Sequence, residues 1–370
     1  MSAPMNNDVE MQYKPQEQMQ AAPSDAQLEQ GNQTEQKPKR TFLGMRGGGL
    51  LVDMCACFIC CECMDGCCHA IDDCLCCCSP GACILQGQAS HELARKLNLE
   101  SARIRDQEPE KFGFFANLPD ILDTQAALVE LQYALDVLKA DGVTLFTRYG
   151  KGNTYLGHPD VQPIWEELNR RACVVFIHPT HPVDTNTVNP RTPQPIIDYP
   201  HETTRTAYDM LTQGTRLKYP ACKVILSHAG GTLPYLISRP TGLVRKMPDA
   251  AAKDRIGATY DEMMVGFQSF HYDLALSTSP AVLRLLLENV PHDHILYGSD
   301  FPYAPPPAYP AFLEDLENST MTSELRDKIN FGNAINLIPR LSKFSACNHS
   351  VQEVQVEHSR TRYVHSMFMD

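Results

Sequence analysis

The sequence predicts an α/β protein with a parallel sheet of the TIM-type (β/α) barrel, apparently lacking its first strands. From about residue 89 onward, short apolar runs alternate with longer segments of helical periodicity, a pattern typical of βαβ units. Several of these apolar runs end in a lone histidine or aspartate, and reactive residues of such barrels lie at the carboxyl ends of the strands. Only six strands can be counted, whereas a closed barrel needs eight.

The expected elements follow from their residues. Strands are expected at 111–119, 142–147, 173–178, 223–228, 270–276 and 295–297. Helices are expected from about Ser90, from Asp123 or Thr124, over 160–171, from about Glu202, from about Thr232, from Pro280, and again up to Leu341. The clearest helix has leucines at 128, 131, 135 and 138, which repeat at helical spacing behind an aspartate or threonine cap. A Pro-rich loop is expected between His178 and Pro200.

Composition divides the chain into four parts. Residues 1–40 are rich in Gln, Pro and Ser without a hydrophobic period, so we expect a disordered tail. Residues 41–88 form a Cys-rich segment, residues 89–341 the barrel domain, and residues 342–370 a polar C-terminal tail.

Charge and hydropathy exclude two classes of partner. The net charge of −12 and the pI near 5.5 argue against a nucleic-acid surface, which needs clustered Lys and Arg. No apolar run reaches the ~20 residues that a membrane-spanning helix needs, and the Gln-rich start does not resemble a secretory signal. A cytosolic enzyme is therefore expected, with a homodimer as an open alternative to a monomer.

The cysteines are concentrated in one segment. Twelve of the fifteen lie between Cys55 and Cys83, and only Cys173, Cys222 and Cys347 lie beyond. Zinc binding, a disulfide framework and acylation remain alternatives for this cluster. Zinc sites fit adjacent Cys-Cys doublets poorly, and disulfides need an oxidising compartment. Acyl chains beside basic residues such as Lys39 and Arg46 would give a membrane-surface association.

Three residues at strand ends are the candidate site. C-V-V-F-I-H ends at His178, K-V-I-L-S-H ends at His228, and I-L-Y-G-S-D ends at Asp300. Because the carboxyl ends of parallel strands meet at one rim, these side chains are expected to converge on a metal or acid–base site. The H-D-H run at 292–294 precedes its strand and so lies about 20 Å from that rim, at ~3.3 Å per residue. It is rejected as part of the site.

Several longer motifs follow one another between about Arg103 and Leu341. They are R-D-Q-E-P-E-K-F-G-F-F-A-N-L-P, Y-L-G-H-P-D-V-Q-P-I-W, V-V-F-I-H-P-T-H-P, S-H-A-G-G-T-L-P and L-Y-G-S-D-F-P-Y. With these motifs the segment resembles the amidohydrolase-related decarboxylases, the group of aminocarboxymuconate-semialdehyde decarboxylase, within the metal-dependent hydrolase superfamily. The nearest resemblance is to the fungal 6-methylsalicylate decarboxylase type.

The resemblance implies a role for each matching residue. His178 corresponds to a metal-ligand histidine, His228 to the catalytic histidine beside the metal, and Asp300 to an aspartate that contacts the metal and moves a proton. His181, Phe301 and Tyr303 are candidate substrate-binding residues, with Phe114 a further pocket wall. The implied cofactor is a divalent metal, zinc first, with manganese or magnesium as alternatives.

The family also has an H-x-H or E-x-H pair that supplies two more ligands, and this sequence has neither before His178. The expected function is metal-dependent, nonoxidative decarboxylation of a hydroxybenzoate-type acid in secondary metabolism, impaired by the missing pair. Two alternatives stay open. One is a metal-dependent hydrolase of the same superfamily, and the other is a nonenzymatic Cys-rich membrane-associated module fused to a barrel remnant.

Overall fold

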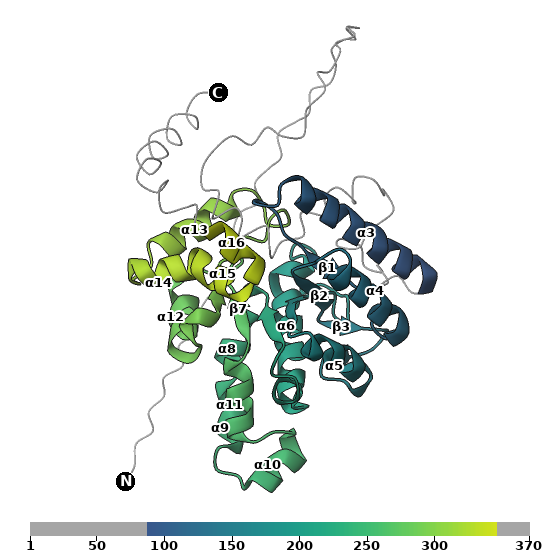
Figure 1. Cartoon of the computed structure of the whole chain (residues 1–370). Coiled ribbons are helices and arrows are strands. Elements are labelled where there is room, and N and C mark those ends of the chain that lie inside the picture. The colour runs from purple at the N-terminus through teal and green to yellow at the C-terminus, as the bar shows by residue number, and fades with distance from the viewer. Residues whose placement is uncertain (1–86, 346–370) are drawn as a thin grey trace, which may run out of the picture. The chain divides into compact units, whose positions relative to one another are not determined.

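A computed structural model describes residues 87–345 (Figure 1). Its centre is a six-stranded parallel sheet with the strand order β1-β2-β5-β6-β7-β8, which confirms the six strands expected from the sequence. The strands are β1 (Phe115–Asn117), β2 (Gly142–Phe146), β5 (Val174–His178), β6 (Lys223–Leu226), β7 (His271–Asp273) and β8 (Ile295–Leu296). A two-stranded hairpin of β3 (Arg148–Tyr149) and β4 (Thr154–Tyr155) follows β2.

Helices precede, connect and follow the strands of the sheet. They are α3 (Gly87–Gln107), α4 (Thr124–Asp136), α5 (Gln162–Arg170), α6 (Gln194–Thr212), α7 (Thr215–Lys218), α8 (Leu233–Leu236), α9 (Ser238–Val244), α10 (Asp249–Ile256), α11 (Tyr260–Gln268), α12 (Pro280–Asn289), α13 (Ala308–Glu317), α14 (Ser323–Asp327), α15 (Asn333–Leu337) and α16 (Ser342–Ser345). Helices α9 and α10 extend away from the sheet (Figure 1). The cap of α4 is as predicted, because Asp123 accepts from the amide of Ala126.

Helix α6 corrects one expectation. The Pro-rich run was predicted to be a loop up to Pro200, but the helix begins at Gln194 and contains Pro200. Pro195 lies in the first turn, where a missing N–H costs nothing. Around Pro200 the carbonyl of the proline accepts from Thr204 Oγ1 within the helix, and the same hydroxyl accepts from the amide of Thr232 outside it, which is a tertiary contact.

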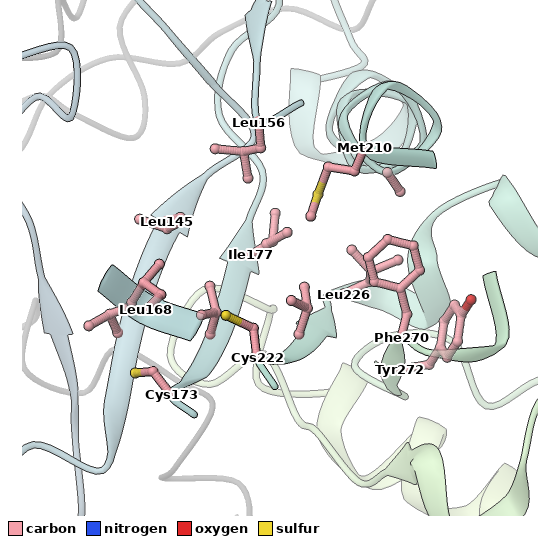
Figure 2. Packing of buried hydrophobic residues seen from close by; sticks show 14 of the residues in the cluster. Leu145, Leu156, Leu168, Cys173, Ile177, Met210, Cys222, Leu226, Phe270 and Tyr272 are labelled. Atoms are coloured by element: carbon pink, nitrogen blue, oxygen red, sulfur yellow. The ribbon is translucent and has the colours of Figure 1, made fainter. Parts of the chain in front are cut away.

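The two faces of the sheet have different cores. On the helix-covered face, alternate strand residues such as Leu145, Ile177 and Leu226 pack against helices, with Met210 of α6 among them (Figure 2). The other face carries the intervening residues, including Phe115, Phe176 and Leu296, packed against Ile338 and Leu341 of the C-terminal segment. This period-two alternation assigns His178 and Asp273 to the second face.

Among residues 87–345, asparagine side chains rather than further strands contact the two edges of this sheet. At β1, Asn98 of α3 donates to the carbonyl of Asn117 (2.9 Å) and accepts from its amide (2.8 Å). At β8, Asn333 donates to the carbonyl of Ile295 (2.8 Å). Both asparagines are buried, with exposed fractions of 0% and 2%. Each makes the hydrogen bonds that a neighbouring strand would otherwise make.

His294, in the rejected H-D-H run, lies at the end of the sheet opposite the carboxyl ends of the strands. Its ring stacks on that of His271, the first residue of β7, with centroids 4.1 Å apart. Burial, with the neighbouring His294, Lys223 and Arg216, lowers the pKa of His271 to about 3.

Some predictions concern residues outside the described range. These are the disordered tail, nearly all of the Cys-rich segment and most of the polar C-terminal tail, although Ser342–Ser345 form the short helix α16. Between residues 87 and 345, no helix combines the length and apolarity that a bilayer crossing requires.

We expect Asn333→Ala to lower the free energy of unfolding by about 1–3 kcal/mol, because a buried backbone carbonyl of β8 would lose its donor. Asn98→Ala should cost at least as much, since both backbone groups of Asn117 lose a partner. Urea unfolding followed by circular dichroism measures the change. The exposed Asn186→Ala is the control, expected within about 0.5 kcal/mol of wild type. Equal stability of all three variants would contradict the edge-covering role.

We expect acid to destabilise the fold partly through His271. The folded ring stays neutral down to about pH 3, whereas an unfolded histidine binds a proton below about pH 6.5. This contribution to stability is therefore present above pH 6.5 and is lost progressively as the pH falls towards 3, by up to about 1.4 kcal/mol per pH unit. Urea unfolding at several pH values should show a shallower dependence for His271→Gln, and an unchanged one for the exposed His201→Gln.

Candidate active site

The three residues singled out from the sequence all lie at the carboxyl end of the sheet. His178 is the last residue of β5, His228 follows β6 by two residues, and Asp300 follows β8 by four. His228 is close enough to both others to influence their pKa values. The structure thus places all three residues at the same rim of the sheet.

The S-H-A-G-G motif forms a tight turn at this rim. His228 and Ala229 have left-handed backbone angles (φ 54° and 55°), which non-glycine residues seldom adopt. The glycines that follow make room for close packing: a Cβ at Gly231 would lie 2.0 Å from the carbonyl oxygen of Pro200, and one at Gly230 2.8 Å from the ring of Tyr272. The motif thus specifies the backbone path that presents His228.

Asp273, which we did not predict, lies under this turn. Its side chain is fully buried at the end of β7, and its Oδ1 accepts from the amides of His228 (3.0 Å) and Ala275 (2.8 Å). The ring of His228 is held as well, since its Nδ1 donates to the carbonyl of Ala275 (3.1 Å). A carbonyl can only accept, so Nδ1 carries the proton and Nε2 is the ring nitrogen left for a ligand.

Burial sets the protonation of the site. It raises the pKa of Asp300 to about 6, with His228 opposing and Asp273 adding to the shift. The pKa of Asp273 is also raised, chiefly by burial. Burial, assisted by His228, lowers the pKa of His178 to about 4. At neutral pH the site therefore has a neutral imidazole at His178 and an aspartate that can still bind a proton near pH 6.

His181 lies in the loop after β5. Its Nδ1 is hydrogen-bonded to Gln194 Oε1, and its ring packs edge-on against Tyr199, with centroids 5.6 Å apart. Arg148 holds the loop by donating to the carbonyls of His181 (2.6 Å) and Pro182 (3.1 Å). The side chain is thus fixed at the first turns of α6, and its predicted role in substrate binding stays a prediction.

The aromatic candidates lie in different places. Phe301 packs against Tyr309 (ring centroids 5.6 Å apart), and Tyr303 is 41% exposed in the loop after Asp300. Phe114 precedes β1 at the opposite end of the strands, where its amide donates to Asp141. The expectation that Phe114 lines the pocket was wrong, because the strand begins one residue after it.

The described side chains do not make a complete metal site. Among residues 87–345, no group of three or more His, Cys, Asp or Glu side chains could hold a metal ion. Zinc sites have three or four protein ligands, whereas only His178 and Asp300 are candidates here. The residues present do not fit a tightly bound ion.

Asp273 could have been found from the sequence. The run F-H-Y-D is an apolar strand with a terminal carboxylate, which is the signal that identified Asp300. Gln194 carried no such signal, because its contact with His181 depends on where α6 begins.

Comparisons with family models, curated proteins and solved structures all point to one family. The amidohydrolase family model matches residues 81–340. A 6-methylsalicylic acid decarboxylase of Penicillium expansum is 49% identical over 249 residues, covering 67% of this chain and 75% of that protein.

The crystal structure of 2,6-dihydroxybenzoate decarboxylase complexed with 2,6-dihydroxybenzoate is 25% identical, with a TM-score of 0.59, and the match covers 67% of this chain and 77% of that one. A dihydroxybenzoic acid decarboxylase from Polaromonas sp. JS666, solved with bound manganese and 2-nitroresorcinol, is 24% identical (TM-score 0.59, 67% and 75% covered) and supports the fold.

These matches confirm three predictions: the TIM-type barrel fold, the resemblance to the amidohydrolase-related decarboxylases, and an enzyme of the carboxy-lyase class. The family model spans well over half of the chain, and the relative from Penicillium agrees with it. The chain therefore belongs to the amidohydrolase family and is related to its decarboxylases.

Proposed function

We propose that this protein is a nonoxidative decarboxylase of a hydroxybenzoate-type aromatic acid such as 6-methylsalicylate, acting in secondary metabolism in the cytosol. The observation that carries the proposal is the arrangement of His228 and Asp300 at one rim, with burial raising the pKa of Asp300 to about 6. A carboxyl group with that pKa can give up a proton near neutral pH and regain it from solvent. The names of the relatives supply the substrate class.

The proposed reaction exchanges carbon dioxide for a proton. The bond between the ring and the carboxylate breaks, its electron pair stays on the ring carbon, and the proton of Asp300 forms the new C–H bond. Asp300 is left ionised and is reprotonated from water. His228 would contact a substituent of the substrate's aromatic ring through Nε2, because its Nδ1 already donates a hydrogen bond to the carbonyl of Ala275.

His181, Phe301 and Tyr303 are the proposed contacts to the aromatic acid. His181 is fixed by Gln194 and Tyr199 near the start of α6. Phe301 and Tyr303 follow Asp300 directly in the chain, so they line the same loop. A homodimer and a membrane-surface association through the Cys-rich segment remain proposals without a described contact.

Zinc is the ion proposed from the sequence, with manganese or magnesium as alternatives. The described side chains offer only two candidate ligands, His178 and Asp300. Because zinc sites use three or four protein ligands, we assign no catalytic step to an ion.

We expect Asp300→Asn to reduce the release of carbon dioxide from 6-methylsalicylate at least ~100-fold, because an amide cannot give up the proton that the ring carbon needs. The assay follows substrate loss and the formation of 3-methylphenol by chromatography. Asp293→Asn, in the H-D-H run at the opposite end of the sheet, is the matched control and should retain full activity. Hydrolysis of lactones or amides without decarboxylation would instead support the hydrolase alternative.

We expect the purified protein to hold less than a full equivalent of zinc, manganese or magnesium after dialysis, because two ligands bind a divalent ion weakly. Elemental analysis by mass spectrometry measures the content, and His178→Ala should lower it further. One tightly bound equivalent in the wild type would show that further ligands come from outside residues 87–345.

A further inference from the structure

We propose that Asp273 is a positioning residue that sets the orientation and tautomer of His228. This inference rests on the proposed function, in which His228 contacts the substrate. It assigns a role to a buried carboxylate that the proposed reaction itself does not use.

The contacts of Asp273 hold His228 from two sides. Its Oδ1 accepts directly from the backbone amide of His228 at 3.0 Å. The same oxygen accepts from the amide of Ala275 at 2.8 Å, and this fixes the peptide whose carbonyl accepts from His228 Nδ1 at 3.1 Å. One carboxylate oxygen thus positions both the backbone and the ring of the histidine.

The turn needs such support because it is strained. His228 and Ala229 both have left-handed angles, each costing on the order of 1–2 kcal/mol for a residue with a Cβ. An unsupported turn would relax towards ordinary backbone angles, and the ring would lose Ala275 as its acceptor. With Nδ1 free, the proton would distribute over both ring nitrogens, and Nε2 would no longer be uniformly an acceptor.

The segment that follows β8 packs against Asp273 itself. A Cβ added at Gly298, just after β8, would lie 3.3 Å from both Cγ and Oδ1 of Asp273 and equally close to the amide of Ala275. The backbone of Gly298 therefore lies close against the carboxylate. Asp273 therefore has little room to turn towards the segment that leads to Asp300.

The test measures the tautomer of His228 by nitrogen-15 NMR, at about pH 8.5, where an ordinary histidine is neutral. Wild type should show His228 protonated on Nδ1. Asp273→Ala should give a mixture of tautomers and lower kcat about 10–100-fold with a much smaller change in KM, since supporting residues of this kind have effects of that size. Asp273→Asn keeps an acceptor oxygen for both amides and should restore the tautomer and most of kcat.

Asp209→Ala is the matched control. Asp209 Oδ2 also accepts a backbone amide, that of Gly157 at 2.7 Å, but in α6, away from the turn. This variant should lose stability while its kcat and the tautomer of His228 stay at the wild-type values. If Asp273→Ala does not fold, Asp273→Ser replaces it, because the shorter side chain no longer reaches the amide of His228.

An unchanged tautomer in Asp273→Ala, with or without a loss of activity, would overturn the proposal, and so would an Asp273→Asn variant as impaired as the alanine variant. A wild type without decarboxylase activity would refute the proposed function alone, because the tautomer is measured without turnover.

Discussion

The rim of this sheet depends on a single buried carboxylate. Asp273 ends β7, accepts from the amide that begins the His228 turn, and lies against the backbone of Gly298 after β8. A carboxyl group without exposed surface is costly to bury unless donors surround it. Here two backbone amides donate to Oδ1, and both belong to the segments that carry or orient His228, whereas Oδ2 is buried without a hydrogen-bond partner among the described residues. The interaction that stabilises Asp273 in the core is therefore the one that arranges the site.

Strain at the rim is balanced by packing beneath it. Left-handed angles occur at His228, Ala229 and Asp300, whereas the strands below have regular pairing from β1 to β8. Strained residues persist where their surroundings determine their conformation, and such residues cluster at functional sites. Helix α6 provides part of this support, because Pro200 and Thr204 contact the glycine turn and Thr232 directly.

The sequence was sufficient for the sheet and for the histidines and aspartate at its rim, since polar residues that end apolar runs are a local signal. Asp273 carries the same local signal at the end of F-H-Y-D. The start of α6 was mispredicted, because a run with several prolines is typical of a loop, and only tertiary contacts show that Pro200 can lie inside a helix. The contact of Gln194 with His181 and the covering of the edges by Asn98 and Asn333 depend on long-range packing. No local pattern encodes such contacts.

The covered edges bear on how the site can work. In a closed barrel each edge strand would bond to another strand, and the family resemblance implies that such a first strand would bring two metal ligands. At β1, Asn98 already occupies both backbone groups of Asn117, and it is itself held by Glu130 at 2.7 Å. A further strand could pair there only by displacing that buried asparagine. The described residues thus cover one backbone position at each edge and offer two candidate metal ligands, His178 and Asp300. In the proposed reaction His228 and Asp300 contact the substrate, and Asp273 acts only by positioning His228.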